Sequence, residues 1–275
     1  MFWLATGKLS YVIVGLVLFA DGVILPVVLL LNGLGYVMIY RLDVFNKRPE
    51  APNQLLWTVI GVTVYIATMA IVKRSRDLDR YRYLLLLASL ILLASPLVPG
   101  VGADINGARL WVVVGGLAFQ PVEIAKLTLT IFFASYFVEK REMLTISTKR
   151  FGNRMIPDLR PFGPLALALA LSLFAIGTEH DVGFLLIVGS GLRIAATARS
   201  EFSKLLAAGL TILIGFQTFF ILAGIERVLP LTGITLPWMS YGGSSLISNY
   251  FLLAILMRIS TEANDRSLDD ILNTV

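Results

Sequence analysis

Long apolar runs alternate with short polar stretches along this 275-residue chain. The runs lie at residues 23–40, 55–72, 84–98, 122–138, 162–176, 182–194, 205–228 and 246–259. A helix that crosses a bilayer takes about 20 mostly apolar residues, so runs of this kind are typical of membrane spans. The pattern therefore predicts an all-α polytopic membrane protein, a helical bundle with about eight crossings.

The amino-acid composition agrees with a membrane protein and indicates a single membrane domain without disulfides. Hydrophobic residues make up 57% of the chain, and its mean hydropathy is +0.81. No polar stretch is long enough for a soluble domain, so residues 1–275 are expected to form a single integral-membrane domain. The N-terminus has no small-residue cleavage site followed by a soluble chain, which favours a retained segment over a removed signal peptide. Cysteine is absent, which excludes disulfides and thiolate metal sites.

Basic residues alternate between the polar stretches. The predicted loops 73–82, 139–160 and 191–204 hold fourteen Lys and Arg, whereas the polar loop 41–54, the glycine-rich loop 100–121 and the loop 226–239 hold five. Because loops rich in Lys and Arg stay in the cytoplasm, the first set is predicted to be cytoplasmic, with both termini on that side. In a membrane protein, the positions of the basic residues matter more than their sum. The net charge of +5 therefore does not indicate nucleic-acid binding, and we expect no nucleic-acid partner.

One segment, residues 229–249, suits neither an ordinary helix nor a simple loop. Its prolines disfavour helix, its glycines permit close backbone approach, and its Ser and Thr side chains can hydrogen-bond unpaired backbone groups. Irregular backbone near membrane depth survives only when it is buried in protein or faces a wet cavity. We interpret the segment as the wall of an outward-facing polar cavity. On composition alone, an outer loop rich in turn residues explains it about as well.

Within this segment, Leu-Pro-Leu-Thr-Gly-Ile-Thr-Leu-Pro-Trp-Met-Ser-Tyr-Gly-Gly-Ser-Ser-Leu closely resembles the C-terminal signature of the RodA/FtsW/SpoVE (SEDS) family. Members of this family are membrane glycosyltransferases that polymerise lipid-linked peptidoglycan precursor in elongation, division or sporulation. By this resemblance, the polar and glycine positions of the signature are expected to bind substrate: Thr232, Ser240, Gly242, Gly243 and Ser244.

A second block leads from a loop into an apolar run. Gly-Ala-Arg-Leu-Trp at 107–111 and Phe-Gln-Pro-Val-Glu-Ile-Ala-Lys at 119–126 both resemble motifs of the same family. Glu123 and Lys126 are spaced i, i+3, so they share one helix face about one turn inside the membrane boundary. They are either a mutually neutralised pair that closes a helix contact or functional groups, because charges at that depth are costly unless paired or facing water. Arg109 either snorkels to the interface or clamps a phosphate with its planar guanidinium.

Asp181 follows the fifth predicted span in the sequence Glu-His-Asp-Val-Gly. On its own, Asp-x-Gly more often marks a cap or a turn. The tripeptide resembles the family's acidic motif, whose aspartate is taken as catalytic, and this resemblance makes Asp181 the expected general base. His180 is the only histidine, so a transition-metal site is not expected. A loosely held divalent cation, Mg²⁺ or Mn²⁺, bound through Asp181 and substrate phosphates is compatible with the sequence.

The resemblance implies an enzyme that joins undecaprenyl-pyrophosphate-linked disaccharide-pentapeptide units (lipid II) in the bacterial cytoplasmic membrane, surrounded by membrane lipid. It also implies a transpeptidase partner, a class B penicillin-binding protein. Two alternatives stay open: a flippase for the lipid-linked precursor, and a catalytically inactive scaffold for the transpeptidase. Relatives carry two further helical segments and a long outer loop between the Asp-x-Gly motif and the Gly-Leu-Arg-Ile block at 191–194. This chain bridges that gap in a handful of residues.

Overall fold

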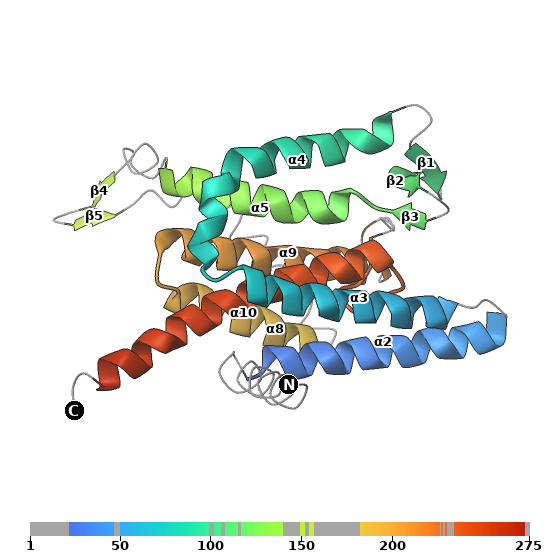
Figure 1. Cartoon of the computed structure of the whole chain (residues 1–275), viewed down its shortest axis with the longest axis horizontal. Helices are drawn as coiled ribbons and strands as arrows, with labels where there is room; N and C mark the ends of the chain where they lie inside the picture. The colour runs from blue at the N-terminus through green and yellow to red at the C-terminus, as the bar shows by residue number, and fades with distance from the viewer. Residues whose placement is uncertain are drawn as a thin grey trace, which may run out of the picture.

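The protein is described by a computed structural model, in which helices run side by side (Figure 1). The structure describes residues 22–46, 50–98, 102–105, 108–114, 117–139, 149–151, 154–156, 182–225, 227, 229 and 234–272. Within these ranges, four helical stretches are long and apolar enough to cross a membrane: Ile24–Phe45, Glu50–Ile71, Glu201–Ile225 and Gly243–Asn264. The prediction of a mostly helical polytopic membrane protein is confirmed.

The helices lie where the apolar runs predict them. They are α2 (Ile24–Asn46), α3 (Glu50–Ile71), α4 (Arg82–Ala94), α5 (Val122–Glu139), α8 (Val182–Thr197), α9 (Glu201–Ile225) and α10 (Gly243–Leu272), with 3-10 turns η1 (Ser75–Tyr81) and η2 (Ser95–Leu97) at either end of α4. Seven of the eight predicted crossings coincide with these helices. The remaining run, 162–176, lies outside the described residues, so the number of crossings stays a prediction.

Helix α10 lies at the centre of the bundle. It packs along α3 and also contacts α5, α8 and α9. Its most apolar window is 78% buried, against 28% for α3 and 39% for α9. Side chains on all faces of α10 between Ser244 and Ser260 are therefore largely enclosed, including polar ones such as Ser248 and Asn249. By contrast, α4 packs mainly on α5 and the adjoining turns among the described elements, and it leaves leucines such as Leu84 and Leu87 exposed.

The stretch 41–54 was expected to be a polar loop, and this expectation is wrong. Helix α2 continues to Asn46, and α3 begins at Glu50. Proline is tolerated in the first turn of a helix because the backbone donors there have no intrahelical partner, so Pro52 does not prevent α3 from starting early. One of these free donors, the Ala51 N–H, is bound by Asp43 Oδ2 at 2.5 Å.

The stretch 100–121, expected to be a glycine-rich loop, contains a small antiparallel sheet. Strands β1 (Gly102–Ile105), β2 (Ala108–Val114) and β3 (Leu117–Phe119) pair in that order, and Val112 lies opposite Gly102 on one side and Phe119 on the other. Trp111 and the valines after it have high strand propensity, and β2 is central because it pairs with the strand before it and the strand after it in the chain. A second hairpin joins β4 (Lys149–Phe151) to β5 (Arg154–Ile156) in the basic stretch 139–160.

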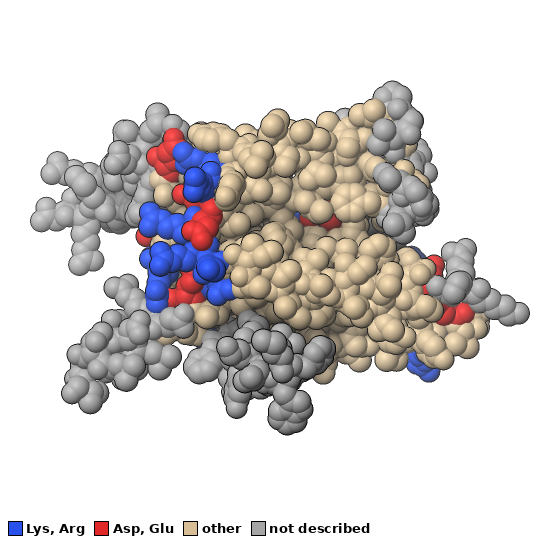
Figure 2. Space-filling view, in the orientation of Figure 1, with Lys and Arg blue, Asp and Glu red and all other residues tan. Residues whose placement is uncertain are grey.

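The basic stretches meet at one end of the molecule. Figure 2 shows Lys and Arg side chains concentrated at the end where α3 finishes and α9 begins. In the sequence, the described basic residues of the stretches 73–82 and 191–204, which adjoin these two helix ends, are Lys73, Arg74, Arg76, Arg80, Arg82, Arg193, Arg199 and Lys204. The three-stranded sheet lies at the opposite end (Figure 1). This arrangement agrees with the alternation of charge along the sequence, while the side of the membrane that each end faces stays a prediction.

Candidate functional site

The segment between α9 and α10 is irregular where the structure describes it, at residues 234–242. Pro237 and Trp238 form the corner of a turn closed by the Met239 N–H and the Leu236 carbonyl at 3.3 Å. Trp238 has φ 58°, a left-handed conformation that costs a non-glycine residue roughly 1–2 kcal/mol. Its ring is 1% exposed, so burial of a large aromatic side chain offsets that strain.

Serine side chains hold this turn and its neighbours together. Ser240 Oγ accepts a hydrogen bond from the Leu236 N–H at 2.9 Å, a role predicted for the Ser and Thr residues of the segment. Ser244 Oγ accepts from the Gln120 N–H at 3.3 Å, which ties the start of α10 to the start of α5. The later part of the segment differs from the prediction, because residues 243–249 form the first turns of α10.

Two adjacent glycines allow the segment to pack closely. A β-carbon on Gly243 would lie 2.5 Å from ring atoms of Trp57 in α3. One on Gly242 would lie 3.0 Å from Cγ2 of Thr235. The absence of a side chain at Gly243 is therefore what lets the first turn of α10 rest on the Trp57 indole ring.

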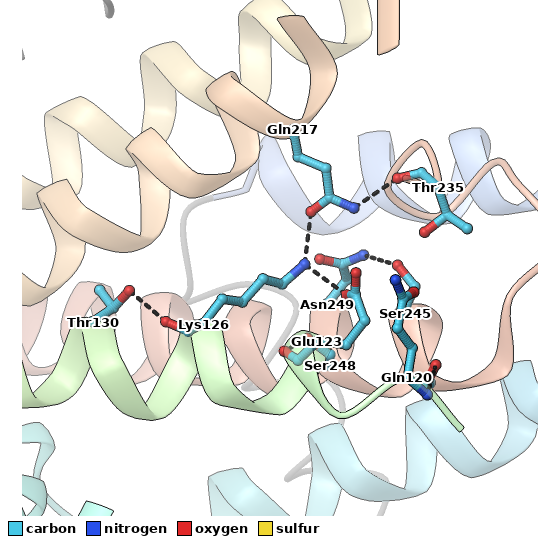
Figure 3. A network of polar contacts seen from close by, with 10 residues as sticks. Gln120, Glu123, Lys126, Thr130, Gln217, Thr235, Ser245, Ser248 and Asn249 are labelled. Atoms are coloured by element: carbon cyan, nitrogen blue, oxygen red, sulfur yellow. Dashed lines mark hydrogen bonds and ion pairs between the residues drawn. The ribbon is translucent and has the colours of Figure 1, made fainter. Parts of the chain in front are cut away.

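Glu123 and Lys126, one turn apart at the start of α5, form an ion pair. Lys126 Nζ lies 2.6 Å from Glu123 Oε2, and the two side chains are 16% and 4% exposed respectively. The ammonium group also donates to Oε1 of Gln217 in α9, at 2.7 Å (Figure 3). The pair is also linked to the segment 229–249. Ser248 Oγ donates to the Glu123 backbone carbonyl at 2.8 Å, and Gln217 Nε2 donates to the Thr235 carbonyl at 2.6 Å.

Of the two interpretations of this pair from the sequence, the structure shows the first, a neutralised pair that closes a helix contact, and the functional role stays a prediction. Glu123 and Lys126 neutralise each other and join α5 to α9, and they do so directly beside the signature segment (Figure 3). A charge pair buried at this depth is favourable only when further hydrogen bonds satisfy it. Gln217 supplies such a bond to the ammonium group, whereas Ser248 bonds the backbone carbonyl of Glu123.

Several buried polar atoms around the segment lack a hydrogen-bond partner among the described residues. They include Thr218 Oγ1, Thr235 Oγ1, Trp238 Nε1 and Asn249 Oδ1. Leaving a buried donor or acceptor unpaired costs about 1–3 kcal/mol, so atoms of this kind mark places where water or a ligand completes the hydrogen bonding. Their position around one segment agrees with a polar binding site there. A cavity open to the outer side stays a prediction.

The predicted site residues fall into three groups. Six are described and lie together where α5, α9 and α10 meet: Glu123, Lys126, Ser240, Gly242, Gly243 and Ser244. For Arg109 the structure describes the backbone, in β2, but not the side chain. Asp181 and Thr232 lie outside the described residues. Their roles stay predictions.

Gln217 was not singled out from the sequence, although a signal for it exists. It is a polar residue in the middle of the apolar run 205–228, and it is 8% exposed in the structure. Polar side chains inside membrane helices face the protein interior and are functional candidates by default. Ser248 carries the same signal in the last run.

The described part of the site does not fit a divalent cation. Among the described residues, no group of three or more His, Cys, Asp or Glu side chains comes together. Glu123, the carboxylate of the network, is already paired with Lys126. A cation site built on Asp181 would involve residues that the structure does not describe, so no chemical step is derived through a metal here.

These features define a class: a polytopic helical membrane protein with a buried ion pair set against an irregular, glycine-rich segment between two spans. The FtsW/RodA/SpoVE family model, described as cell cycle protein, matches residues 22–188 and 162–265. The chain belongs to this family.

Similarity to curated proteins supports this family assignment. Peptidoglycan glycosyltransferase RodA of Mycobacterium tuberculosis (strain ATCC 25618 / H37Rv) is 31% identical, over 88% of this chain and 78% of that protein. Probable peptidoglycan glycosyltransferase FtsW of Nitrosomonas europaea is 26% identical, over 88% of this chain and 93% of that protein. The alignment with the mycobacterial RodA runs over 366 residues, whereas this chain has 275. The relative therefore contains stretches that this chain lacks.

Solved structures share the fold. A point-mutant form of the Thermus thermophilus rod shape determining protein RodA has a TM-score of 0.65 and 25% identity, over 88% of this chain and 98% of that one. A chain from a peptidoglycan synthase complex that coordinates polymerization and crosslinking has a TM-score of 0.63 and 22% identity, over 90% of this chain and 99% of that one. The second likeness shows the fold alone.

Proposed function

We propose that this chain is a peptidoglycan glycosyltransferase that polymerises lipid II during cell-wall synthesis in elongation or division. The observation that carries the proposal is the buried ion pair of Glu123 and Lys126 beside the signature segment, in a chain of the FtsW/RodA/SpoVE family. Lys126 Nζ and Glu123 Oε2 are 2.6 Å apart. The names of its RodA and FtsW relatives support the activity. The four long apolar helices support an integral membrane protein, as a lipid-linked substrate requires.

The reaction transfers a glycosyl group from a pyrophosphate lipid to a sugar hydroxyl. The bond between the donor sugar and its pyrophosphate oxygen breaks, and the electron pair leaves with the polyprenyl pyrophosphate. The acceptor hydroxyl oxygen forms the new glycosidic bond, and its proton passes to a base. The site must therefore stabilise negative charge on the leaving group and supply a base within hydrogen-bond reach of the acceptor.

Lys126 is the proposed ligand of the leaving pyrophosphate, together with Arg109. An ammonium or guanidinium group forms charge-assisted hydrogen bonds with phosphate oxygens, and Glu123 orients Lys126 through their ion pair. The proposed base is Asp181, on the resemblance of its motif. Ser240, Gly242, Gly243, Ser244 and Thr232 complete the wall against which the substrate head group is held. Arg109→Ala and Lys126→Ala are each expected to weaken lipid II binding about ten- to a hundredfold.

We further propose that the charge-rich end of the bundle is cytoplasmic and that the signature faces the outer side of the bacterial cytoplasmic membrane. A class B penicillin-binding protein is the proposed partner. The structural likeness to a chain from a peptidoglycan synthase complex supports such an assembly. Mg²⁺ or Mn²⁺ held by Asp181 and substrate phosphates remains a proposal resting on the sequence alone.

The test is polymer formation by purified protein in the presence of a transpeptidase partner. Labelled lipid II is incubated with wild type, Asp181→Asn and Glu179→Gln, and the products are separated on a gel. Wild type and Glu179→Gln are expected to form polymer. Asp181→Asn keeps the shape of the side chain without its basicity, so it should bind lipid II but react about 10²–10⁴ times more slowly.

The same assay separates the alternatives. An inert wild type that still binds the transpeptidase would identify a scaffold and overturn the proposed activity. Movement of labelled lipid II between the leaflets of vesicles, without polymer, would identify a flippase. Normal polymerisation by Asp181→Asn would show that another group is the base.

A further inference from the structure

Gln217 connects the three parts of the site. It lies within α9, and its side chain reaches both Lys126 of α5 and Thr235 of the signature segment (Figure 3). Oε1 accepts from Lys126 Nζ at 2.7 Å, and Nε2 donates to the Thr235 carbonyl at 2.6 Å. The residue is 8% exposed, so both contacts are shielded from solvent.

The chemistry of the two neighbours allows only one orientation of this amide. An ammonium group donates and never accepts, while a backbone carbonyl accepts and never donates. Rotating the amide by half a turn would place N–H groups against the Lys126 ammonium and an oxygen against the Thr235 carbonyl. The Gln217 amide therefore accepts from Lys126 and donates to the Thr235 carbonyl at the same time, which neither an aliphatic side chain nor a carboxylate could do.

Within the part of the chain that the structure describes, Lys126 keeps one unused donor. Its ammonium group has three N–H bonds, of which Glu123 Oε2 and Gln217 Oε1 accept two at 2.6 and 2.7 Å. No third acceptor for it is found among the described residues. Because the substituents of the nitrogen are tetrahedral, two fixed hydrogen bonds also fix the direction of the third N–H.

We infer that Gln217 is a positioning residue for substrate: it fixes the Lys126 ammonium against the signature segment so that the remaining N–H meets an anionic phosphate oxygen. The inference rests on the proposed function, in which that oxygen belongs to the pyrophosphate of the lipid donor. Thr235 takes part because its carbonyl anchors the amide to the segment that forms the wall of the site. A shift of this segment would thereby be transmitted to Lys126.

A purely structural role would have a different signature. If Gln217 served only to hold α9 against α5, its loss would lower stability and affect binding whether or not Lys126 is present. If it acts through Lys126, its effect on binding should disappear once Lys126 has been replaced. A double-mutant cycle on ligand affinity separates the two cases.

The experiment uses the full chain in nanodiscs, with undecaprenyl pyrophosphate as the probe. Gln217→Met, Lys126→Met and the double variant are compared with wild type for affinity and melting temperature. Gln217→Met keeps the length of the side chain and removes both hydrogen bonds. The matched control is Thr211→Val, which removes a buried hydroxyl of the same helix that bonds only the Ala207 carbonyl of α9 itself, at 2.7 Å, among the described residues.

Gln217→Met is expected to bind the probe about tenfold more weakly, and Lys126→Met about ten- to a hundredfold more weakly. The double variant should bind no more weakly than Lys126→Met, and Thr211→Val should match wild type. Should Gln217→Met fail to fold, Gln217→Glu serves in its place. It is also expected to bind more weakly, because it adds negative charge beside Lys126.

Unchanged affinity in Gln217→Met, or losses that add in the double variant, would overturn the inference. A wild type that does not bind the probe would overturn it as well. A wild type that binds the probe and shows the expected cycle, yet makes no polymer from lipid II, would support the positioning role while overturning the proposed activity.

Discussion

Gly243 and Trp57 pack so closely that no side chain fits between them. A β-carbon on Gly243 would lie 2.5 Å from Cδ2 and Cε2 of the indole ring, well inside van der Waals contact. Gly243 begins α10, and Trp57 lies in α3, so the contact joins the start of the central helix to its most extensive packing partner. Position 243 is thus constrained by packing as well as by its place in the signature.

Gly243→Ala is therefore expected to destabilise the protein by about 1–3 kcal/mol, the usual cost of overpacking a well-filled contact. Thermal unfolding in detergent measures the change. Gly33→Ala is the matched control, since a β-carbon on Gly33 meets nothing within 4 Å and Gly33 also lies in a membrane helix. Equal melting temperatures for the two variants would show that Trp57 moves aside at no cost.

The Glu123–Lys126 pair predicts a difference between stability and binding. Lys126→Met leaves the Glu123 carboxylate buried without a cation, and Glu123→Gln leaves Lys126 with a neutral partner. Breaking a buried pair by removing one partner costs about 3–5 kcal/mol, whereas replacing both partners is often neutral. The melting temperature of the variant that combines Glu123→Gln with Lys126→Met should therefore exceed that of Lys126→Met alone.

Lipid II binding should not recover in the same way. The double variant lacks the ammonium group, so its affinity is expected to stay as low as that of Lys126→Met. Recovery of both stability and affinity in the double variant would show that the pair only holds α5 in place.

The orientation of the bundle can be tested with single cysteines, because the chain contains none of its own. Arg76 is exposed at the charge-rich end, and Tyr241 is 40% exposed in the signature segment. In intact cells, Arg76→Cys should resist a membrane-impermeant thiol reagent and Tyr241→Cys should react. Ser75 is unsuitable for this purpose because it is fully buried. The reverse labelling pattern would invert the proposed topology.

Glu262 near the end of α10 fixes the turn η1. Its carboxylate accepts from the Ser75 N–H at 2.5 Å and from Ser75 Oγ at 2.8 Å, and Ser75 Oγ also meets Ser203 Oγ at 2.9 Å. Hydrogen bonds to a charged group contribute about 1.5–3 kcal/mol. Glu262→Ala should therefore speed hydrogen exchange in residues 75–81 and lower the melting temperature.

Glu262→Gln is the graded control for that prediction. Its amide oxygen can still accept one of the two hydrogen bonds, so its effects should lie between those of wild type and Glu262→Ala. Equal exchange rates in all three proteins would show that η1 is held by its other contacts.

Much of the fold was accessible from the sequence. Hydropathy located the helices because lipid requires about 20 apolar residues per span, a local property of the chain. The i, i+3 spacing of Glu123 and Lys126 predicted their common face for the same reason, since helix geometry fixes near neighbours. The polar loops were harder to predict from the sequence. Helices α2 and α3 extend into the predicted loop 41–54, and β2 forms within the predicted loop 100–121.

The site itself was decided by contacts between residues distant in sequence. Local pattern showed that Gln217 is polar, but the fold alone placed it between Lys126 and Thr235. Likewise, no periodicity relates Trp57 to Gly243 or Ser75 to Glu262. Spans are determined by the solvent that surrounds each segment, whereas partners across helices depend on how all the spans pack at once. The sequence alone therefore determined the membrane class, the helices and the family, and the tertiary structure decided which polar groups meet.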